Sequence, residues 1–408
     1  MKPLSQHLSG QLKTLQNQHL LRQLRPITSP QTVTLEQGDR SMIAFASNDY
    51  LGLATHRNVK EASKEAIEKY GAGSGASRLI TGSLPPHRRL EEQLAKFKGT
   101  EAALAFGSGY QTASSVIACL LTENDTLISD RLNHACLIDG ARLSKATIKI
   151  FEHNDLDQLE SILKVLADDQ ARQRHDPGNL LIVTESVFSM DGDQAPLAEI
   201  AALKNRYGAW LMVDEAHATG LYGPQGQGWA ECTGTSHNID IQMGTLGKAV
   251  GAAGGFISGS QMLIDFLVNR ARSFIFSTAP TPASAAAAIA AIEIIQSAEG
   301  SALRARLWQR VRELRAGLEQ PEPDPSPIVP LLIGSESQCL KIAAQLEAQG
   351  FLVPAIRYPS VPRNQARLRI TLSAQHTQPH AVQLLQALSQ IKATNIGHKV
   401  IESTPLSL

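Results

Sequence analysis

The sequence predicts an α/β protein built on a mostly parallel sheet, and three observations lead to that prediction. Apolar runs at residues 180–184 and 209–213 lack the polar alternation of a half-exposed strand, and a further strand-like run follows at 239–243. Helical punctuation separates the first two runs, with Pro196 at the start and Gly208 at the end. Alternation of strand and helix favours right-handed crossovers and therefore parallel pairing.

Composition limits the possible classes of protein. A chain of 408 residues suits two domains, or one large domain with a smaller companion. Lys plus Arg and Asp plus Glu number 38 each, which gives no electrostatic footprint for nucleic acid or an anionic membrane. The four cysteines are scattered, so neither a disulfide framework nor a metal site is expected.

Targeting signals are not apparent in the sequence. The first residues, MKPLSQHLSGQLKTL, lack the apolar core of a secretory signal. The most apolar tract, residues 283–295, is shorter than the roughly 20 residues that a membrane-spanning helix needs. We therefore expect a cytoplasmic protein without a membrane partner.

The N-terminal region predicts an arm followed by a compact segment. Residues 1–46 indicate a polar helix through Leu24, a break at the prolines and a short strand at 42–46. Arginines at the end of that helix would suit its dipole. A helix at 59–70 precedes the glycine-rich residues 71–78, and a dinucleotide loop requires a strand there, which excludes a Rossmann site.

A second glycine-rich segment precedes a helical pattern. Residues 107–110, GSGY, come directly before a predicted helix at 111–121. Backbone amides at a helix start form an anion site that suits a phosphate, although any glycine-rich helix start shows this pattern. A buried strand at 126–129 and the isolated His134 follow, and an isolated histidine is more often structural.

The most informative chemistry follows the strands at 209–213 and 239–243. Asp214 and His217 come after the first strand, and Thr245 and Lys248 after the second, at the edge where open α/β sheets bind ligands. A buried carboxylate holds a heterocyclic nitrogen protonated, and a desolvated lysine forms a Schiff base with a carbonyl, as pyridoxal phosphate requires. The alternative from spacing alone is a strand-end cap and a surface lysine.

The C-terminal third predicts a small α/β domain. A strand at 254–259 and a helix at 261–272 lead to two long helices, where arginines 304–315 suggest a solvated face or a contact with an acyl carrier. Proline-rich residues 321–330 resemble a linker. Strands at 328–333, 351–353 and 367–372 then alternate with helices at 337–349 and 378–391. Arg369 would be exposed if the last strand lay at an edge.

Long motifs spread over nearly the whole chain give a specific resemblance. SNDYLGL (47–53), GSGASRLITGS (73–83), FGSGYQ (106–111), ESVFSMDGDQAPLAEI (185–200), VDEAHATG (213–220), GTLGK (244–248) and RLRITLSAQH (367–376) stand in the family's order. The chain resembles the α-oxoamine synthase family of fold-type I pyridoxal-phosphate enzymes, which share the aminotransferase class I/II fold.

The resemblance implies a domain organisation. We expect an arm at 1–46, a large domain at 47–291 that binds pyridoxal phosphate, a small domain at 292–395 and a tail at 396–408. The large domain should contain a mostly parallel seven-stranded sheet with helices on both faces. Family members of this kind are homodimers with active sites at the subunit interface.

The resemblance also implies roles for individual residues. Lys248 would carry the cofactor, Asp214 would hold its pyridinium nitrogen, and His134 would stack on its ring. The remaining cofactor contacts would come from Gly109, Tyr110, Ser189, His217, Thr245, Ser277 and Thr278. Substrate contacts would come from Arg22, Asn48, Ser77, Arg369 and Thr371, with Arg369 gripping the amino-acid carboxylate.

The implied activity is a decarboxylative condensation of an amino acid with an acyl thioester. DGDQAPLAEI and DEAHATG look most like the branch that joins L-alanine to a pimeloyl thioester, carried by coenzyme A or a carrier protein, in biotin biosynthesis. Ser77, where 5-aminolevulinate synthases carry threonine, would leave room for the methyl group of alanine. The alternatives are the glycine-using relatives, glycine C-acetyltransferase and 5-aminolevulinate synthase, and a catalytically silent partner subunit.

Overall fold

The computed structural model describes residues 3–172, 178–320 and 325–394, which belong to two compact units. The large unit comprises residues 49–189 and 193–305. The small unit draws on Met1–Asn48, Met190–Gly192 and Arg306–Leu408. The expected domain boundaries at 46, 291 and 395 stay predictions, and the expected tail lies outside the described residues.

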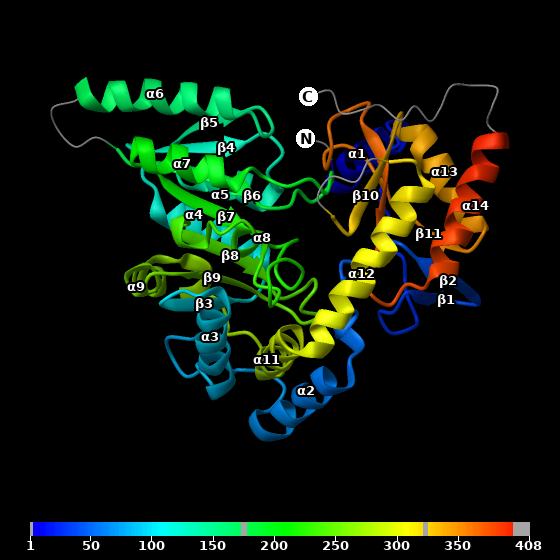
Figure 1. The fold of residues 1–408 in the computed structure, drawn as a ribbon, viewed down its shortest axis with the longest axis horizontal. Coiled ribbons are helices and arrows are strands. Elements are labelled where there is room, and N and C mark those ends of the chain that lie inside the picture. The colour runs from blue at the N-terminus through cyan, green and yellow to red at the C-terminus, as the bar shows by residue number, and fades with distance from the viewer. Residues whose placement is uncertain (1–2, 173–177, 321–324, 395–408) are drawn as a thin grey trace. The chain divides into compact units, whose positions relative to one another are not determined.

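A seven-stranded sheet forms the centre of the large unit (Figure 1). Its strand order is β3-β9-β8-β7-β6-β4-β5, and all pairs are parallel except those that β9 makes. The strands are β3 (Ala102–Phe106), β4 (Thr126–Asp130), β5 (Thr147–Phe151), β6 (Leu180–Glu185), β7 (Trp210–Asp214), β8 (Ile241–Thr245) and β9 (Gly255–Gly259). The prediction of a mostly parallel seven-stranded sheet is confirmed.

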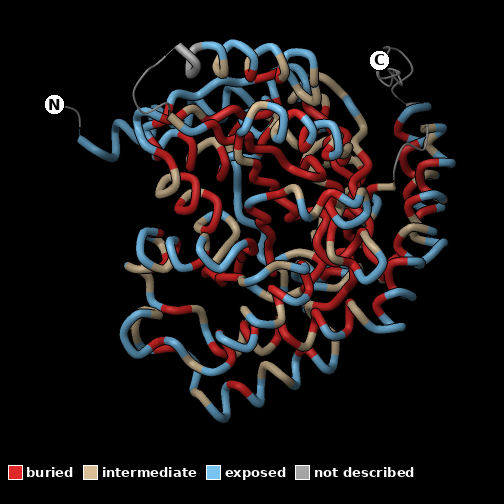
Figure 2. Tube along the Cα trace, turned by 60° about the vertical axis from the view of Figure 1, so that its left-hand side comes forward, coloured by how far each residue is buried: buried red, intermediate tan, exposed pale blue. Residues whose placement is uncertain are grey.

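Both faces of the central strands of this sheet are covered, because these strands are apolar on both sides. In β6, Leu181 and Val183 join one apolar cluster while Leu180 and Ile182 join another. The first cluster includes side chains of α4 (Gly109–Leu120), α5 (Ala135–Leu143), α9 (Gln261–Arg270) and α10 (Arg272–Ile275). The second includes those of α6 (Leu156–Arg172), α7 (Leu197–Tyr207) and α8 (Trp229–Cys232). Figure 2 shows the resulting buried interior in red.

The remaining helices of the large unit lie apart from these two clusters. They are η1 (Leu53–Thr55), α2 (Arg57–Tyr70), α3 (Pro85–Lys98), η2 (Ser236–Asn238) and α11 (Pro282–Gln296), followed by α12 (Ala298–Gly317), which continues into the small unit. Across the described ranges, no single helix is long and apolar enough to span a membrane. By length and composition alone, only the pair α11 and α12 passes that test, and it is bent by 76°.

The small unit contains two three-stranded sheets. One orders β10 (Ile328–Gly334), β13 (Ala366–Thr371) and β12 (Ala355–Ile356) antiparallel. The other joins the hairpin of β1 (Thr34–Gln37) and β2 (Arg40–Ala44) to β11 (Phe351–Leu352). Helices α1 (Leu4–Asn17), α13 (Glu336–Ala348) and α14 (Gln378–Thr394) complete the unit. The N-terminal hairpin therefore shares a sheet with a C-terminal strand.

Two local expectations from the sequence are wrong. Helix α1 ends at Asn17, not Leu24, because the chain turns at His19, whose φ is 57°, and buries Leu20. Arg306 and Arg312 are exposed, but the solvated face expected for arginines 304–315 is wrong for Arg304 and Arg315, which are buried. Their guanidinium groups donate to the carbonyls of Ile295 and Ile328, at 2.7 and 3.4 Å.

Candidate active site

Four adjacent parallel strands of the large unit end at the same edge of the sheet. Strands β8, β7, β6 and β4 finish on Thr245, Asp214, Glu185 and Asp130. Glu185 pairs with Asp214 in register, which places two carboxylates side by side. The sheet topology therefore brings polar groups from distant parts of the sequence to one edge, as open α/β sheets do.

Lys248 lies on the tight reversal between β8 and the antiparallel β9. The amide of Leu246 donates to Gly254 O at 3.0 Å, and the amide of Gly251 donates to Lys248 O at 2.8 Å. Gly251 has φ of 67° and approaches the Leu53–Ala54 backbone so closely that a Cβ would lie 2.4 Å from Ala54 N. This turn holds the lysine partly buried, with Nζ 2.7 Å from Nε2 of His217.

His217 connects the lysine to a buried tyrosine. Its Nδ1 lies 2.6 Å from the hydroxyl of Tyr50, and both side chains are buried. Tyr50 lies within the SNDYLGL motif but was not among the predicted site residues. Only the fold reveals this contact, because 167 residues separate the two side chains in the sequence.

Asp214 and Glu185 are carboxylates kept away from water. Asp214 is 3% exposed, and its Oδ1 accepts a hydrogen bond from the amide of Ala216 at 2.8 Å. Burial raises the pKa of Asp214, and the hydrogen bond from the amide of Ala216 offsets this effect only in part. Burial also raises the pKa of Glu185 well above its usual value, and the charge of Asp214 raises it further. This edge of the sheet therefore favours a positive charge beside Asp214.

A buried ion pair fixes the turn that carries Asp214 and His217. Glu215 is paired with Lys98 from the last turn of α3, and it also accepts the amide of Ala230 at 2.9 Å. A Cβ on Gly228 would lie 2.3 Å from this carboxylate, at a φ of 144°. The pair thus joins the end of β7 to two neighbouring segments, and sequence reasoning missed it.

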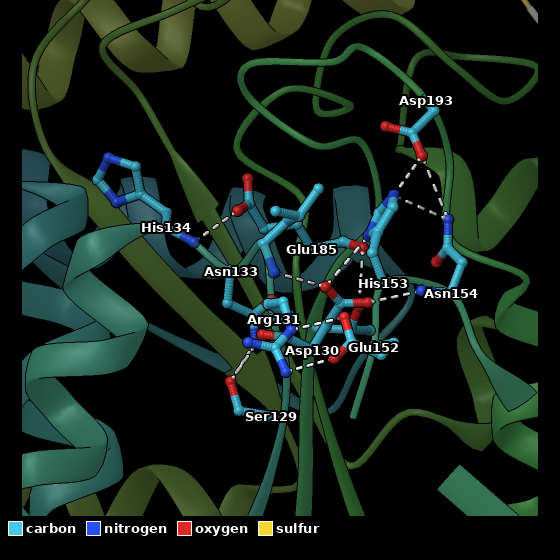
Figure 3. Close-up of polar contacts among 12 residues, drawn as sticks. Ser129, Asp130, Arg131, Asn133, His134, Glu152, His153, Asn154, Glu185 and Asp193 are labelled. Atoms are coloured by element: carbon cyan, nitrogen blue, oxygen red, sulfur yellow. Dashed lines mark hydrogen bonds and ion pairs between the residues drawn. The ribbon is translucent and has the colours of Figure 1, made fainter. Parts of the chain in front are cut away.

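His134 caps helix α5 and presents an exposed ring. Its backbone amide donates to Glu185 Oε1 at 2.7 Å, a contact drawn in Figure 3. Its Nδ1 accepts the amide of Cys136 at 3.3 Å, which fixes the orientation of the imidazole. Glu185 was not selected as a site residue from the sequence, but its carboxylate fixes the backbone of His134 through this hydrogen bond.

A second histidine lies between two carboxylates at the same sheet edge. Figure 3 shows His153 between Asp130, at the end of β4, and Asp193, with contacts of 3.1 and 2.6 Å. Desolvation opposes the charge of His153, but the two carboxylates prevail and raise its pKa to about 10. The ring also stands edge-on against Phe188, with centroids 4.3 Å apart. This contact ties β4 and β5 to the loop that carries Ser189.

Two of the predicted phosphate contacts lie together. Gly109 begins α4, whose cap Ser108 accepts the amide of Gln111 at 3.2 Å. A Cβ on Gly109 would lie 3.4 Å from Oγ1 of Thr245, so the helix start and the end of β8 are adjacent. The exposed hydroxyl of Tyr110 donates to the carboxylate of Asp139, which raises the pKa of Tyr110.

The other predicted contacts in the large unit lie on loops. Ser189 is buried in the segment closed by the amide of Phe188, which donates to Asp193 O at 2.9 Å. Ser77 pairs with Thr278 as an isolated antiparallel bridge, and Ser277 precedes Thr278 on that loop. The structure therefore places one predicted substrate residue beside two predicted cofactor residues.

The predicted substrate residues of the small unit form one cluster and an outlier. Nη1 of Arg369 donates to Asn48 Oδ1 at 3.2 Å and to Thr371 Oγ1 at 3.0 Å. The possibility of an exposed edge strand is wrong for Arg369, because β13 is the central strand and the residue is buried. Arg22 is exposed and donates to Tyr358 O at 3.3 Å.

In the part of the chain that the structure describes, no group of three or more His, Cys, Asp or Glu side chains is placed to hold a metal ion.

Comparisons with known sequences give consistent matches over nearly the full length. A family model described as aminotransferase class I and II matches residues 40–388. An 8-amino-7-oxononanoate synthase from Geobacter sulfurreducens is 44% identical, over 95% of this chain and 98% of its own length. Another from Bordetella petrii is also 44% identical, with the same coverage of both chains.

Solved structures of similar fold were also found. A serine palmitoyltransferase from Sphingomonas wittichii superposes with a TM-score of 0.87 at 28% identity, over 97% of this chain and 100% of that chain. A structure of SPT with PLP gives 0.87 at 28% identity, over 97% and 99%. An 8-amino-7-oxononanoate synthase from Francisella tularensis gives 0.73 at 27% identity, over 87% and 99%.

Proposed function

This chain belongs to the aminotransferase class I and II family, and from that premise we propose that it is a pyridoxal-phosphate-dependent acyltransferase of biotin biosynthesis. Its reaction would condense L-alanine with a pimeloyl thioester to give 8-amino-7-oxononanoate, carbon dioxide and the carrier thiol. The observation that carries the proposal is the contact between Lys248 Nζ and His217 Nε2, at a strand end that neighbours the buried Asp214. Relatives named 8-amino-7-oxononanoate synthase, 44% identical over nearly the whole chain, support this choice of product.

The residues present fit pyridoxal phosphate. Asp214 is buried, and burial raises its pKa, so a protonated ring nitrogen beside it would stabilise its charged form. The start of α4 at Gly109 and the hydroxyl of Thr245 lie together, where a phosphate would find amide and hydroxyl donors. The exposed ring of His134 offers a flat surface for stacking. When bound, the cofactor supplies a reactive carbonyl carbon and an electron-withdrawing ring.

The roles of the protein groups follow from their surroundings. Nζ of Lys248 would hold the cofactor's carbonyl carbon and, once released, take up the α-proton of L-alanine. His217 would direct a ring N–H at the cofactor's phenolic oxygen, with Ser189 as a second donor. Asp214 would accept the hydrogen bond of the ring nitrogen and keep its proton in place.

Arg369 and its neighbours in the small unit would bind the amino-acid substrate. The guanidinium group of Arg369 is already oriented by Asn48 and Thr371, so its planar donors are suited to hold the alanine carboxylate. Ser77 would face the methyl group of alanine, and Arg22 would contact the acyl substrate. The assignments of Arg369 and Ser77 rest on motifs that carry the family resemblance, and that of Arg22 rests on the likeness of the N-terminal arm to oxononanoate synthases.

A homodimer is part of the proposal. Exposed apolar side chains support it: Leu79, Ile80 and Phe276 are 49, 75 and 70% exposed. They lie on two loops that the bridge between Ser77 and Thr278 holds together. If a second copy covers these loops, Ser277 and Thr278 of one subunit would reach the cofactor phosphate bound in the other subunit. Sedimentation velocity would test this, and a monomer at micromolar concentration would contradict it.

The proposed activity is tested by thiol release from purified protein supplied with pyridoxal phosphate. We expect release of coenzyme A with L-alanine and pimeloyl-CoA, and product of the mass of 8-amino-7-oxononanoate. Pimeloyl-carrier protein, offered in parallel, identifies the preferred carrier. Turnover confined to glycine with acetyl-CoA or succinyl-CoA would move the assignment to a glycine-using relative. Absence of turnover with every pair would favour a silent partner subunit.

A further inference from the structure

Tyr50, Lys248 and His217 form a short chain of polar contacts at the end of β7. The tyrosine hydroxyl lies 2.6 Å from Nδ1 of His217, and Nε2 of the same ring lies 2.7 Å from Nζ of Lys248. Tyr50 has no exposed surface and His217 is 4% exposed. The histidine therefore lies between a phenol and an amine in a site largely closed to water.

The two ring nitrogens of a neutral imidazole play opposite roles. One carries the hydrogen and donates, while the other offers a lone pair and accepts. The partner at one nitrogen therefore decides what the other can do. A tyrosine hydroxyl that donates to Nδ1 leaves the ring hydrogen on Nε2, the nitrogen that faces the lysine.

We propose that Tyr50 is a positioning residue that holds His217 in the tautomer with its hydrogen on Nε2. In that tautomer Nε2 donates toward Nζ of Lys248, which accepts through its lone pair and is therefore unprotonated. An unprotonated amine is the form that acts as a nucleophile and a base. The same N–H is the donor that a phenolic oxygen of the cofactor requires, so the catalytic meaning rests on the proposed function.

The backbone around Tyr50 is held firmly enough for such a role. The carboxylate of Asp49 accepts the amides of Leu53 and Ala54, at 2.9 and 3.1 Å. The same Leu53–Ala54 backbone lies against Gly251 on the turn that carries Lys248. Because the two turns touch, the tyrosine and the lysine approach the histidine from segments whose separation is fixed.

The tautomer is measurable in the full-length chain without turnover. Long-range ¹⁵N–¹H spectra of protein labelled at its histidines distinguish protonated from unprotonated ring nitrogens, and a His217→Gln variant assigns the signals. We expect His217 to carry its hydrogen on Nε2, both without cofactor and after addition of pyridoxal phosphate. Tyr50→Phe, which keeps the buried ring, should abolish this preference and lower kcat/KM by about tenfold.

A matched control is Tyr207→Phe, which removes a hydroxyl that donates to Glu160 at 3.1 Å on the outer helices α6 and α7. It should leave the His217 signals and kcat/KM unchanged. Hydrogen on Nδ1 in the wild-type chain, or an unchanged tautomer in Tyr50→Phe, would overturn the inference. Because the spectra need no substrate, a wild-type chain that fails to use L-alanine would refute the proposed function alone.

Discussion

His217 and His153 lie at the same edge of the large sheet, yet their neighbours differ in charge. His217 contacts a hydroxyl and an amine, whereas His153 contacts two carboxylates. The carboxylates raise the pKa of His153 to about 10, so this ring stays charged at neutral pH and holds structure together. The first environment leaves a ring that can exchange hydrogen bonds during a reaction. The comparison teaches that the partners of a histidine, rather than its position on the sheet, separate a structural from a chemical role.

The largest expected effect on activity comes from Lys248, the residue that contacts His217. Lys248→Ala should lower kcat by at least about 10³-fold while leaving stability nearly unchanged, because the lost amine is reactive rather than structural. Borohydride reduction followed by peptide mass spectrometry should find cofactor mass on Lys248 of the wild-type chain. Lys64→Ala, at an exposed position on α2, is the control. Cofactor mass on another lysine would contradict the assignment.

Asp214→Asn should lower kcat by about 10²-fold, because an amide cannot stabilise the charge of a protonated ring nitrogen. Stability should not fall, since the substitution removes a buried anion whose charge raises the pKa of Glu185. Steady-state kinetics measures the change in kcat, and urea unfolding measures the change in stability. Asp265→Asn, on the exposed face of α9, should change neither quantity. A loss of stability without a loss of kcat would make Asp214 a structural cap.

His153→Gln should have the opposite effect, with a large loss of stability and a small loss of kcat. Removing the cation between Asp130 and Asp193 leaves one buried carboxylate uncompensated, at a cost of about 3 kcal/mol in the free energy of unfolding. The effect on kcat should stay below about tenfold, because the loss reaches the site only through the Ser189 loop. Chemical unfolding provides the measurement, with His237→Gln at an exposed position as the comparison. A variant as stable as the wild type would refute the structural role.

The difference in unfolding free energy between the wild type and His153→Gln should depend on pH. The pKa of His153 is raised from 6.5 to about 10 on folding, so its stabilisation is complete below pH 6.5. It should decline as pH rises toward 10, because the folded state then loses its proton as well. Unfolding free energies of wild type and His153→Gln, taken from pH 6 to 10, should therefore converge. A difference independent of pH would show that charge is not the source.

The sequence predicted strands β7 and β8 because their signals are local. The apolar run at 209–213 exceeds what a surface segment would carry and leads directly into Asp214, whereas the run at 239–243 alternates apolar and polar residues. The sheet places β7 and β8 side by side, as such runs suggest. The direction of β9 was not predictable from its apolar residues, since parallel and antiparallel strands share that pattern. Strand β5 was missed because most of its residues are exposed.

The contacts that hold the site residues in place were not predicted by local sequence patterns, because they join segments distant in the sequence. Lys98 precedes its partner Glu215 by 117 residues, and no local pattern marks either as half of a buried pair. Arg369 and Asn48 are separated by 321 residues, so their grouping came from family motifs rather than from periodicity. The roles assigned to the site residues stay predictions until the experiments above are done.

The antiparallel turn at Lys248 has a consequence for the order of folding. Its hydrogen bonds join residues close in sequence, so closing the loop costs little chain entropy. The register between Glu185 and Asp214 instead requires a crossover through α7, and such distant pairings form slowly. We expect the hairpin that bears the lysine to form early, and the carboxylates to reach it when the parallel sheet assembles. Assembly of the sheet would therefore be the step that brings the carboxylates and the lysine to one edge.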